Sequence, residues 1–410
     1  MTTPSGTPTD LIGTLLAIDP GSPLARLRAR RPEATRHTQG SYEALFAPAA
    51  PATSVTTTER FAAALRVARL HGDQVLAEHY TGQLLGAGGA GGAGGAGGAG
   101  GAGGAGGAGG AGGADGVTKE FVAAVEDVRP LRPATEPSAP DPLSDRLRAI
   151  LAHTDLLVLR PAAATPADLD ALAEAGLDAA AIITVSQLIA YVSFQVRLLA
   201  GLALIRGDER PAPGPARGPL DAPRTGFTQE QLGWTPWLEP VAVEDVTDEQ
   251  RAVLPGQRLQ SPYFRLLALD PAVLGERTAT DNGIFYTRGG LPRQERELAA
   301  TVTSRVNGCV FCASVHSRFA SQLSKRDEDV QRLLDEGVDT PLDDRWRAIT
   351  DLSAALTTTP PTADRSHIAA LRELGLDDLD ILDAAQAAAF FAWANRLMLT
   401  LGDPEPPAQP

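Results

Sequence analysis

The chain has 410 residues and a formal net charge of -14, with 43% hydrophobic and 5% aromatic residues. Such a length predicts two or three domains, and plentiful Ala and Leu with few aromatics favour helices over sheets. An acidic chain is repelled by nucleic acid and by anionic lipid, so we expect neither as a partner. The N-terminus lacks the pattern of a secretory signal, and the longest apolar segment (182–205) contains Ser, Gln and Arg, which indicates a buried helix. We therefore expect a cytoplasmic protein without a membrane span.

Three segments have compositions that oppose a packed fold. Residues 86–114 are almost entirely Gly and Ala, which predicts a flexible insertion, because Gly loses much backbone entropy on ordering. Residues 206–226 are rich in Pro and Gly and indicate a linker, and residues 403–410 indicate a disordered tail.

The two sides of the linker repeat each other. Residues 144–199 match residues 343–398 at a fixed offset of 199, including Arg146 with Arg345 and Gln187 with Gln386. The residues ahead of these two segments also match each other, more weakly and at an offset of about 239. Neither copy shows runs of alternating strand pattern, and helices that begin near Pro or Asp and end at Gly are frequent. We expect an all-α protein of two tandem helical domains, at 1–205 and 227–402.

Both cysteines of the chain, Cys309 and Cys312, lie in the stretch NGCVFCASVHSRF with His316. A helix is predicted to start after Pro292 and stop at Asn307–Gly308, so the next helix begins near Cys309. The positive end of a helix lowers the pKa of a thiol, and the spacing places both thiols and the imidazole on one helix face. A solvent-reachable redox dithiol with a nearby proton carrier is the favoured hypothesis.

The same three side chains are compatible with chemistry that is not catalytic. A structural disulfide, a zinc site and two inert buried cysteines compete with the redox dithiol. A carboxylate on the preceding helix could complete a proton relay if the two helices pack antiparallel. Glu297 is the first candidate and Glu295 the second, and the sequence does not choose between them.

The combination Glu297, Cys309, Cys312 and His316 resembles the active-site signature of the AhpD-like alkylhydroperoxidases of the carboxymuconolactone decarboxylase superfamily. The likeness is clearest over about 25 residues from Glu295 to Phe319, in the peroxidase-related branch. It implies that Cys312 attacks a hydroperoxide, that Cys309 resolves the sulfenic acid to a disulfide, and that Glu297 and His316 relay protons. Phe311 stands where some members carry a second histidine.

The resemblance also implies partners. We expect a hydroperoxide substrate, an external dithiol reductant of the lipoamide or thioredoxin type, no cofactor or metal, and a homo-oligomer. The alternatives are a non-redox enzyme like the decarboxylases and a redox-sensing binding or scaffold protein.

The N-terminal copy lacks the dithiol. The match at an offset of about 239 puts Leu70 to Asp73 at the place of the CxxC, with Glu59, His71 and His79 nearby. We expect a degenerate copy kept for packing, with a non-redox site as the alternative.

Overall fold

The computed structural model describes residues 10–48, 53–89, 117–128, 142–208 and 226–406. The first half contains α1 (Leu11–Leu15), α2 (Pro23–Ala29), α3 (Pro32–Phe46), α4 (Thr57–Leu70), α5 (Gln74–Gly89), α6 (Lys119–Glu126), α7 (Asp145–Leu159), α8 (Pro166–Glu174) and α9 (Ala179–Arg206). The second contains β1 (Gly233–Pro236), α10 (Asp248–Val253), α11 (Pro262–Leu267), α12 (Pro271–Phe285), α13 (Arg293–Asn307), α14 (Val310–Ser324), α15 (Asp327–Glu336), α16 (Asp344–Thr357), α17 (Arg365–Glu373), α18 (Asp378–Thr400) and β2 (Gly402–Glu405). Short 3-10 turns occupy Pro161–Ala163, Val243–Asp245 and Gly256–Gln260. The prediction of an all-α fold is confirmed.

The helices start and stop where their sequences carry capping residues. Asp178 and Asp377 are the N-caps of α9 and α18, and each side chain accepts a backbone N–H of the first turn. Gly207 and Gly308 end α9 and α13 in the left-handed conformation that glycine adopts without strain. These local signals explain why the predicted helix boundaries agree closely with the observed ones.

The duplication seen in the sequence is a duplication of structure. The three helices α7, α8 and α9 start at residues 145, 166 and 179, and α16, α17 and α18 start at 344, 365 and 378. Each pair of starts differs by the same 199 residues as the sequence match. Ahead of them, α3, α4 and α5 correspond in order to α12, α13 and α14.

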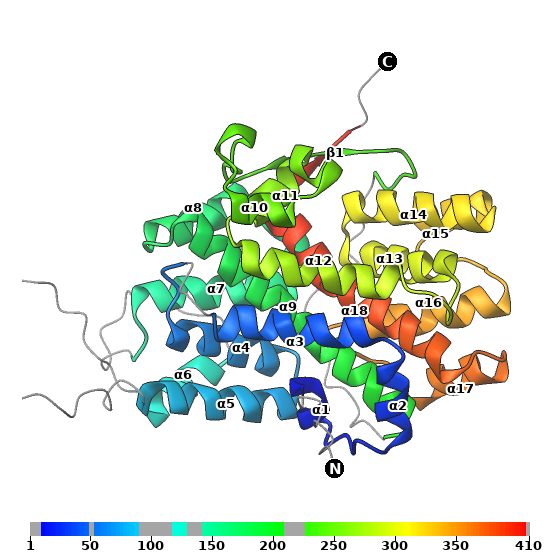
Figure 1. The fold of residues 1–410 in the computed structure, drawn as a ribbon, viewed down its shortest axis with the longest axis horizontal. Helices are drawn as coiled ribbons and strands as arrows, with labels where there is room; N and C mark the ends of the chain where they lie inside the picture. The colour runs from blue at the N-terminus through cyan, green and yellow to red at the C-terminus, as the bar shows by residue number, and fades with distance from the viewer. Residues whose placement is uncertain (1–9, 49–52, 90–116, 129–141, 209–225, 407–410) are drawn as a thin grey trace, which may run out of the picture.

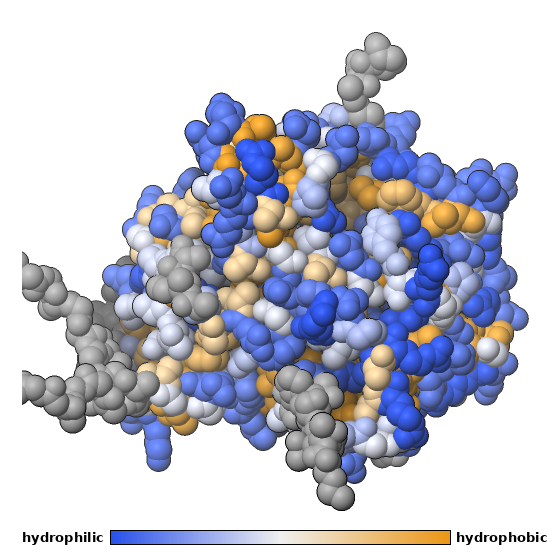
Figure 2. All heavy atoms as spheres, viewed as in Figure 1, coloured by the Kyte–Doolittle hydropathy of each residue, from blue (hydrophilic) through white to orange (hydrophobic). Residues whose placement is uncertain are grey.

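The two copies share one hydrophobic core around the antiparallel pair α9 and α18. Trp393 on α18 donates to the side chain of Gln187 on α9 at 2.9 Å and packs edge-on to Tyr191. In Figure 1, α3 and α12 cross in front of this pair, with α4 to α8 towards one side and α13 to α17 towards the other. The apolar atoms on the face in Figure 2 form small separate groups rather than one broad patch.

In each copy, a buried arginine at the equivalent position donates a hydrogen bond to a backbone carbonyl of the other copy. Arg197 on α9 donates to the carbonyl oxygen of Thr357 at the end of α16, at 2.8 Å. Arg396 on α18 donates to that of Val158 near the end of α7, at 3.4 Å. A cation at a helix C-terminus satisfies carbonyl groups that have no partner within the helix.

Helix α9 is long and apolar enough to cross a membrane by length and composition, but 94% of its most apolar window is buried inside the protein. The prediction of a buried helix is therefore confirmed.

Two predictions about soft segments need correction. Residues 403–405 belong to strand β2, which pairs antiparallel with β1, so the predicted disordered tail does not begin at 403. Helix α5 continues through residues 86–89, because Ala and the preceding leucines sustain the helix into the Gly/Ala segment. The remainder of that insertion (90–114), most of the linker (209–225) and the end of the tail (407–410) lie outside the described residues.

Candidate active site

The two cysteines lie at the turn between α13 and α14. Gly308 has φ +75° and reverses the chain after Asn307, as predicted. Cys309 is the N-cap of α14, and its backbone N–H donates to the carbonyl oxygen of Ser304 at 2.8 Å. Cys312 follows in the first turn of α14, where backbone N–H groups have no partner within the helix.

The two cysteines are not joined by a disulfide. The thiol of Cys309 hydrogen-bonds to the sulfur of Cys312. However, Cys309 is 1% exposed and Cys312 is 4% exposed, and both belong to the hydrophobic core. The prediction of a solvent-reachable pair is wrong for this conformation, because the neighbouring helices pack closely over the start of α14.

The environment of Cys312 favours its thiolate. The hydrogen bond from Cys309 lowers the pKa of Cys312 the most; burial opposes this, and the charge of His316 and a hydrogen bond from Asn395 add to the lowering. The net pKa lies below the usual value for a thiol. The ionised sulfur is the nucleophilic form, so the lowered pKa favours the nucleophilic state of Cys312.

A carboxylate and an imidazole meet beside the thiols. Nδ1 of His316 lies 2.6 Å from Oε2 of Glu297, while Glu295 forms a bidentate ion pair with Arg345 at 2.7 and 2.8 Å. Glu297 is therefore the carboxylate that contacts the histidine. The helices α13 and α14 pack side by side, as a relay between them requires.

The ion pair shifts the pKa of each partner in the direction that favours its charged form. Burial alone would lower the pKa of His316, but the Glu297 carboxylate outweighs it and raises that pKa. Burial alone would raise the pKa of Glu297, but His316 and Arg293 outweigh it and lower that pKa. Both groups are thus charged over a wider pH range than isolated side chains.

His316 is the member of the group that meets solvent, with 17% of its side chain exposed. Its ring packs edge-on to Phe391 at 4.2 Å between centroids and lies 5.8 Å from Phe285. Arg293 covers the other side of Glu297, bonding to it at 3.0 Å while its guanidinium lies over the ring of Tyr286.

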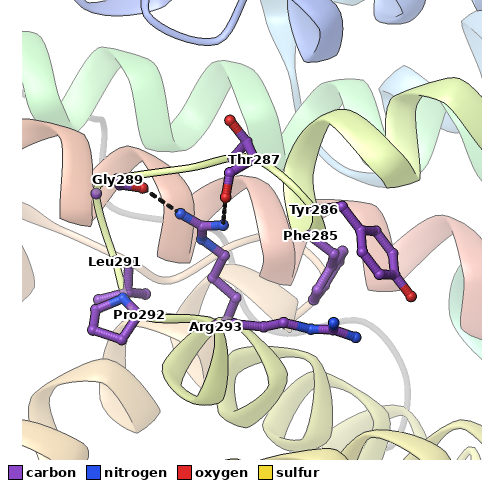
Figure 3. A pocket seen from close by; sticks show the side chains of 9 residues that line it. Phe285, Tyr286, Thr287, Gly289, Leu291, Pro292 and Arg293 are labelled. Atoms are coloured by element: carbon purple, nitrogen blue, oxygen red, sulfur yellow. Dashed lines mark hydrogen bonds between the residues drawn. The ribbon is translucent and has the colours of Figure 1, made fainter.

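A pocket of about 280 Å³ opens next to this ion pair, where the chain passes from α12 to α13. Phe285, Tyr286, Leu291, Pro292 and Arg293 are among its lining residues. The guanidinium of Arg296 donates hydrogen bonds to the carbonyl oxygens of Thr287 and Gly289, at 3.2 and 2.7 Å. Dashed lines mark these two bonds in Figure 3. The pocket shares Phe285 and Arg293 with the surroundings of His316 and Glu297, but neither cysteine lines it.

Among the described residues, no group of three His, Cys, Asp or Glu side chains could hold a metal ion.

The structure also corrects the alignment of the N-terminal copy. Glu59 pairs with Arg146 at 2.7 Å just as Glu295 pairs with Arg345, and α4 is followed by the left-handed Gly72 as α13 is by Gly308. These helices are offset by 236 residues, because the connector 47–56 is three residues longer than its counterpart 286–292. The offset of 239 holds for α3 and α12.

The corrected alignment places aromatic and apolar side chains at three of the four site positions in the N-terminal copy, and an aspartate at the fourth. Asp73 and Leu76 stand at the places of Cys309 and Cys312, Phe61 at that of Glu297, and Tyr80 at that of His316. Phe61 and Tyr80 pack with Phe46 at 5.3 Å each between ring centroids.

The polar residues proposed for an N-terminal site do not come together. Glu59 pairs with Arg146, His71 contacts Ser193 at 3.3 Å, and His79 contacts Tyr42 at 3.2 Å. The structure thus favours the degenerate copy over a non-redox site.

Three polar residues of the C-terminal site were not identified from the sequence: Asn395, Asp281 and Arg277. Burial raises the pKa of Asp281, which lies close enough to Arg277 and His316 to feel both charges. A comparison of the two copies, position by position, could have identified all three residues. Their counterparts in the N-terminal copy are Val196, Tyr42 and Thr38, so each site position gains polarity or charge relative to its copy.

The fold and the site define this half of the chain as a helical domain with a CxxC dithiol at a helix start and a Glu–His pair beside it. Residues 271–355, from α12 into α16, match the model of the carboxymuconolactone decarboxylase family. For this segment, the match confirms the resemblance to the carboxymuconolactone decarboxylase superfamily that the sequence indicated.

Two solved structures are similar to part of the chain. One is the alkylhydroperoxidase AhpD core of an uncharacterised peroxidase-related protein from Ralstonia eutropha, with 23% identity, a TM-score of 0.35, and coverage of 39% of this chain and 86% of that one. The other is an uncharacterised peroxidase-related protein from a Silicibacter species, with 24% identity, a TM-score of 0.35, and coverage of 40% and 92%. No curated protein matches the chain significantly.

Replacing Glu297 with glutamine should lower the pKa of His316 and the stability of the protein. Because the pKa of His316 is raised in the folded state, its contribution to stability is complete below pH 6.5, the usual pKa of histidine, and is lost as the pH rises through the raised pKa. Because the pKa of Glu297 is lowered in the folded state, its contribution is complete above pH 4.5, the usual pKa of glutamate, and is lost as the pH falls through the lowered pKa. The wild type should therefore exceed E297Q most, by roughly 1–3 kcal/mol, between pH 4.5 and 6.5. Urea unfolding at a series of pH values measures this difference, and a difference that does not vary with pH would contradict the ion pair.

Proposed function

We propose that the C-terminal copy reduces hydroperoxides through a dithiol that cycles between two thiols and a Cys309–Cys312 disulfide. The observation that carries this proposal is the contact of the Cys309 thiol with the Cys312 sulfur at the start of α14, beside the Glu297–His316 pair. A resolving thiol next to a nucleophilic one limits over-oxidation, which suits a peroxidase.

The reaction has two oxidative steps. The Cys312 thiolate attacks the terminal peroxide oxygen, the O–O bond breaks, and the alkoxide takes a proton from protonated His316 to leave as alcohol. The sulfur becomes a sulfenic acid. Cys309 then loses its proton and attacks that sulfur, hydroxide leaves and is protonated to water, and the disulfide forms. An external dithiol reduces the disulfide by thiol–disulfide exchange.

The electrostatics of the site agree with these roles. The pKa of Cys312 is lowered mainly by the Cys309 hydrogen bond, which supports Cys312 as the attacking thiolate. The pKa of His316 is raised by Glu297 against the effect of burial, so His316 holds a proton that it can donate to a departing oxygen.

The burial of the sulfurs restricts what can react. A hydroperoxide must displace the side chains that cover Cys312, and the pocket between α12 and α13 offers an approach through Phe285 and His316. Small hydroperoxides are therefore the proposed substrates. A dithiol reductant of the lipoamide or thioredoxin type, a homo-oligomer and a cytoplasmic location remain parts of the proposal.

The proposal is tested by following the consumption of tert-butyl hydroperoxide with excess dihydrolipoamide or dithiothreitol. Consumption in proportion to enzyme, over many equivalents, supports a peroxidase. Oxidation of the dithiol once per chain, without continued turnover, would instead favour the redox-sensing alternative. No reaction of either kind would leave the non-redox decarboxylase-like alternative.

A further inference from the structure

The pocket between α12 and α13 has a cationic wall. Arg293 and Arg296 are among its lining residues, which include no aspartate and no glutamate. The remaining lining is uncharged and largely apolar, with Phe285, Leu291 and Pro292 among it. In a chain of net charge -14, such a wall attracts anions that most of the surface repels.

Arg296 has a buried donor that no described protein group accepts. The residue is 2% exposed, and its Nη groups donate to the carbonyl oxygens of Thr287 and Gly289 and to the carboxylate of Asp383. Its Nε has no hydrogen-bond partner among the described residues. A buried N–H without an acceptor is unfavourable, so an acceptor supplied by a ligand in the pocket would stabilise it.

The carboxylates near the two arginines are not part of the pocket wall. Asp383 bonds to Arg296 at 2.8 Å, and Glu297 bonds to Arg293 at 3.0 Å. Asp380 also lies close enough to Arg296 to act on its charge. None of the three is among the lining residues, so a ligand in the pocket meets the guanidinium groups rather than their counter-ions.

Arg293 is placed to bind an anion while it keeps its contact with Glu297. That contact uses Nε alone, whereas Arg345 binds Glu295 through both Nε and Nη2. The Nη groups of Arg293 are therefore not taken up by Glu297. The side chain is 33% exposed and extends toward Tyr286 in Figure 3. A guanidinium group with free prongs matches the geometry of a carboxylate.

We propose that this pocket binds a carboxylate of the substrate, and that the preferred substrates are small organic hydroperoxides that carry one. Arg293 and Arg296 bind the carboxylate, and the apolar wall packs against the hydrocarbon part. Phe285 lines the pocket and lies 5.8 Å from the ring of His316, so the hydroperoxide end extends past Phe285 toward the Glu–His pair. The substrate class rests on the proposed function, whereas the anion site does not.

Binding is tested with two ligands that cannot react: para-isopropylbenzoate, and para-isopropylacetophenone, in which a neutral acetyl group replaces the carboxylate. Saturation-transfer NMR titrations of the full chain give their dissociation constants. The benzoate should bind roughly tenfold more tightly, about the value of one charge-assisted hydrogen bond. Equal dissociation constants, or no binding of the benzoate, would overturn the proposal.

The variant R293Q removes the charge at the outer part of the wall. It should weaken benzoate binding by roughly tenfold and leave acetophenone binding unchanged. R332Q removes another partly exposed arginine, on α15, and should match the wild type. If R293Q folds poorly, raising potassium chloride from about 0.05 to 0.5 M should weaken benzoate binding alone in the wild type, because salt screens charge. Benzoate binding that neither R293Q nor salt weakens would refute the role of Arg293.

A kinetic comparison tests the substrate class. The readout is the ratio of kcat/KM for para-carboxycumene hydroperoxide to that for cumene hydroperoxide, because loss of Arg293 also affects Glu297 and so changes both rates. The wild type should favour the carboxylated substrate roughly tenfold, and R293Q should lose this preference. Turnover of both substrates without preference would refute this inference and leave the peroxidase proposal standing. Selective benzoate binding without turnover of either substrate would support the anion site and refute the peroxidase proposal.

Discussion

Replacing Cys312 with serine is expected to reduce hydroperoxide consumption to the rate of the buffer. A serine hydroxyl of similar size stays protonated near neutral pH and cannot form a sulfenic acid, while the lowered pKa of the Cys312 thiol supplies the nucleophile. The loss should be complete rather than partial, because Cys309 at the N-cap is 1% exposed and lies further from His316 along the helix. Steady-state consumption of tert-butyl hydroperoxide with excess dithiol measures it.

C309S is the matched comparison, since it removes the second thiol from the same helix start. It should consume one equivalent of hydroperoxide and then stop, leaving a sulfenic acid on Cys312 that dimedone traps. Q322A, at an exposed position of the same helix, should retain wild-type turnover. Full activity in C312S with loss in C309S would reverse the two roles.

Replacing Asp383 with asparagine is expected to destabilise the protein by about 3–5 kcal/mol. Asp383 is 1% exposed and accepts two hydrogen bonds from Arg31 at 2.7 Å and one from Arg296 at 2.8 Å. It also accepts the backbone N–H of Leu291 at 3.0 Å. An amide keeps the shape but removes the charge, so two buried guanidinium groups lose their counter-ion.

The position of Asp383 makes this loss informative about the assembly of the two copies. Arg31 belongs to the N-terminal copy, whereas Arg296 and Asp383 belong to the C-terminal copy. Urea unfolding followed by circular dichroism measures the change. D351N, which weakens an exposed i,i+4 pair with Arg347, should cost no more than about 0.5 kcal/mol. Equal effects of the two substitutions would contradict the importance of the buried cluster.

Much of the fold could be predicted because the same helical unit occurs twice in the sequence. The match of Arg146 with Arg345 and the glycines that end the helices fixed the helix order without any tertiary information. The alignment of α4 with α13 was wrong by three residues, since a loop insertion shifts the numbering and weakly similar helices do not reveal it. The ion pairs of Glu59 and Glu295 show the correct alignment only in three dimensions.

The site could be predicted where its residues are close in sequence, and less well where they come from distant elements. The spacing of Cys309, Cys312 and His316 on one helix was sufficient to group them. The choice of Glu297 over Glu295 needed the packing of α13 on α14, because the two carboxylates differ only in the direction they face. Asn395 comes from α18 and contacts Ser304 and Asn307 of α13, and burial of the thiols also depends on how distant helices pack, so neither follows from local spacing.

In the proposed reaction, the two sulfurs together give two electrons to a hydroperoxide. The intact mass of the reduced protein, measured before and after one equivalent of tert-butyl hydroperoxide, tests this most directly. We expect a loss of about two mass units, with the new bond between Cys309 and Cys312 found by peptide mapping and reversed by a dithiol. An unchanged mass, or a stable gain of oxygen on Cys312 without a disulfide, would contradict it.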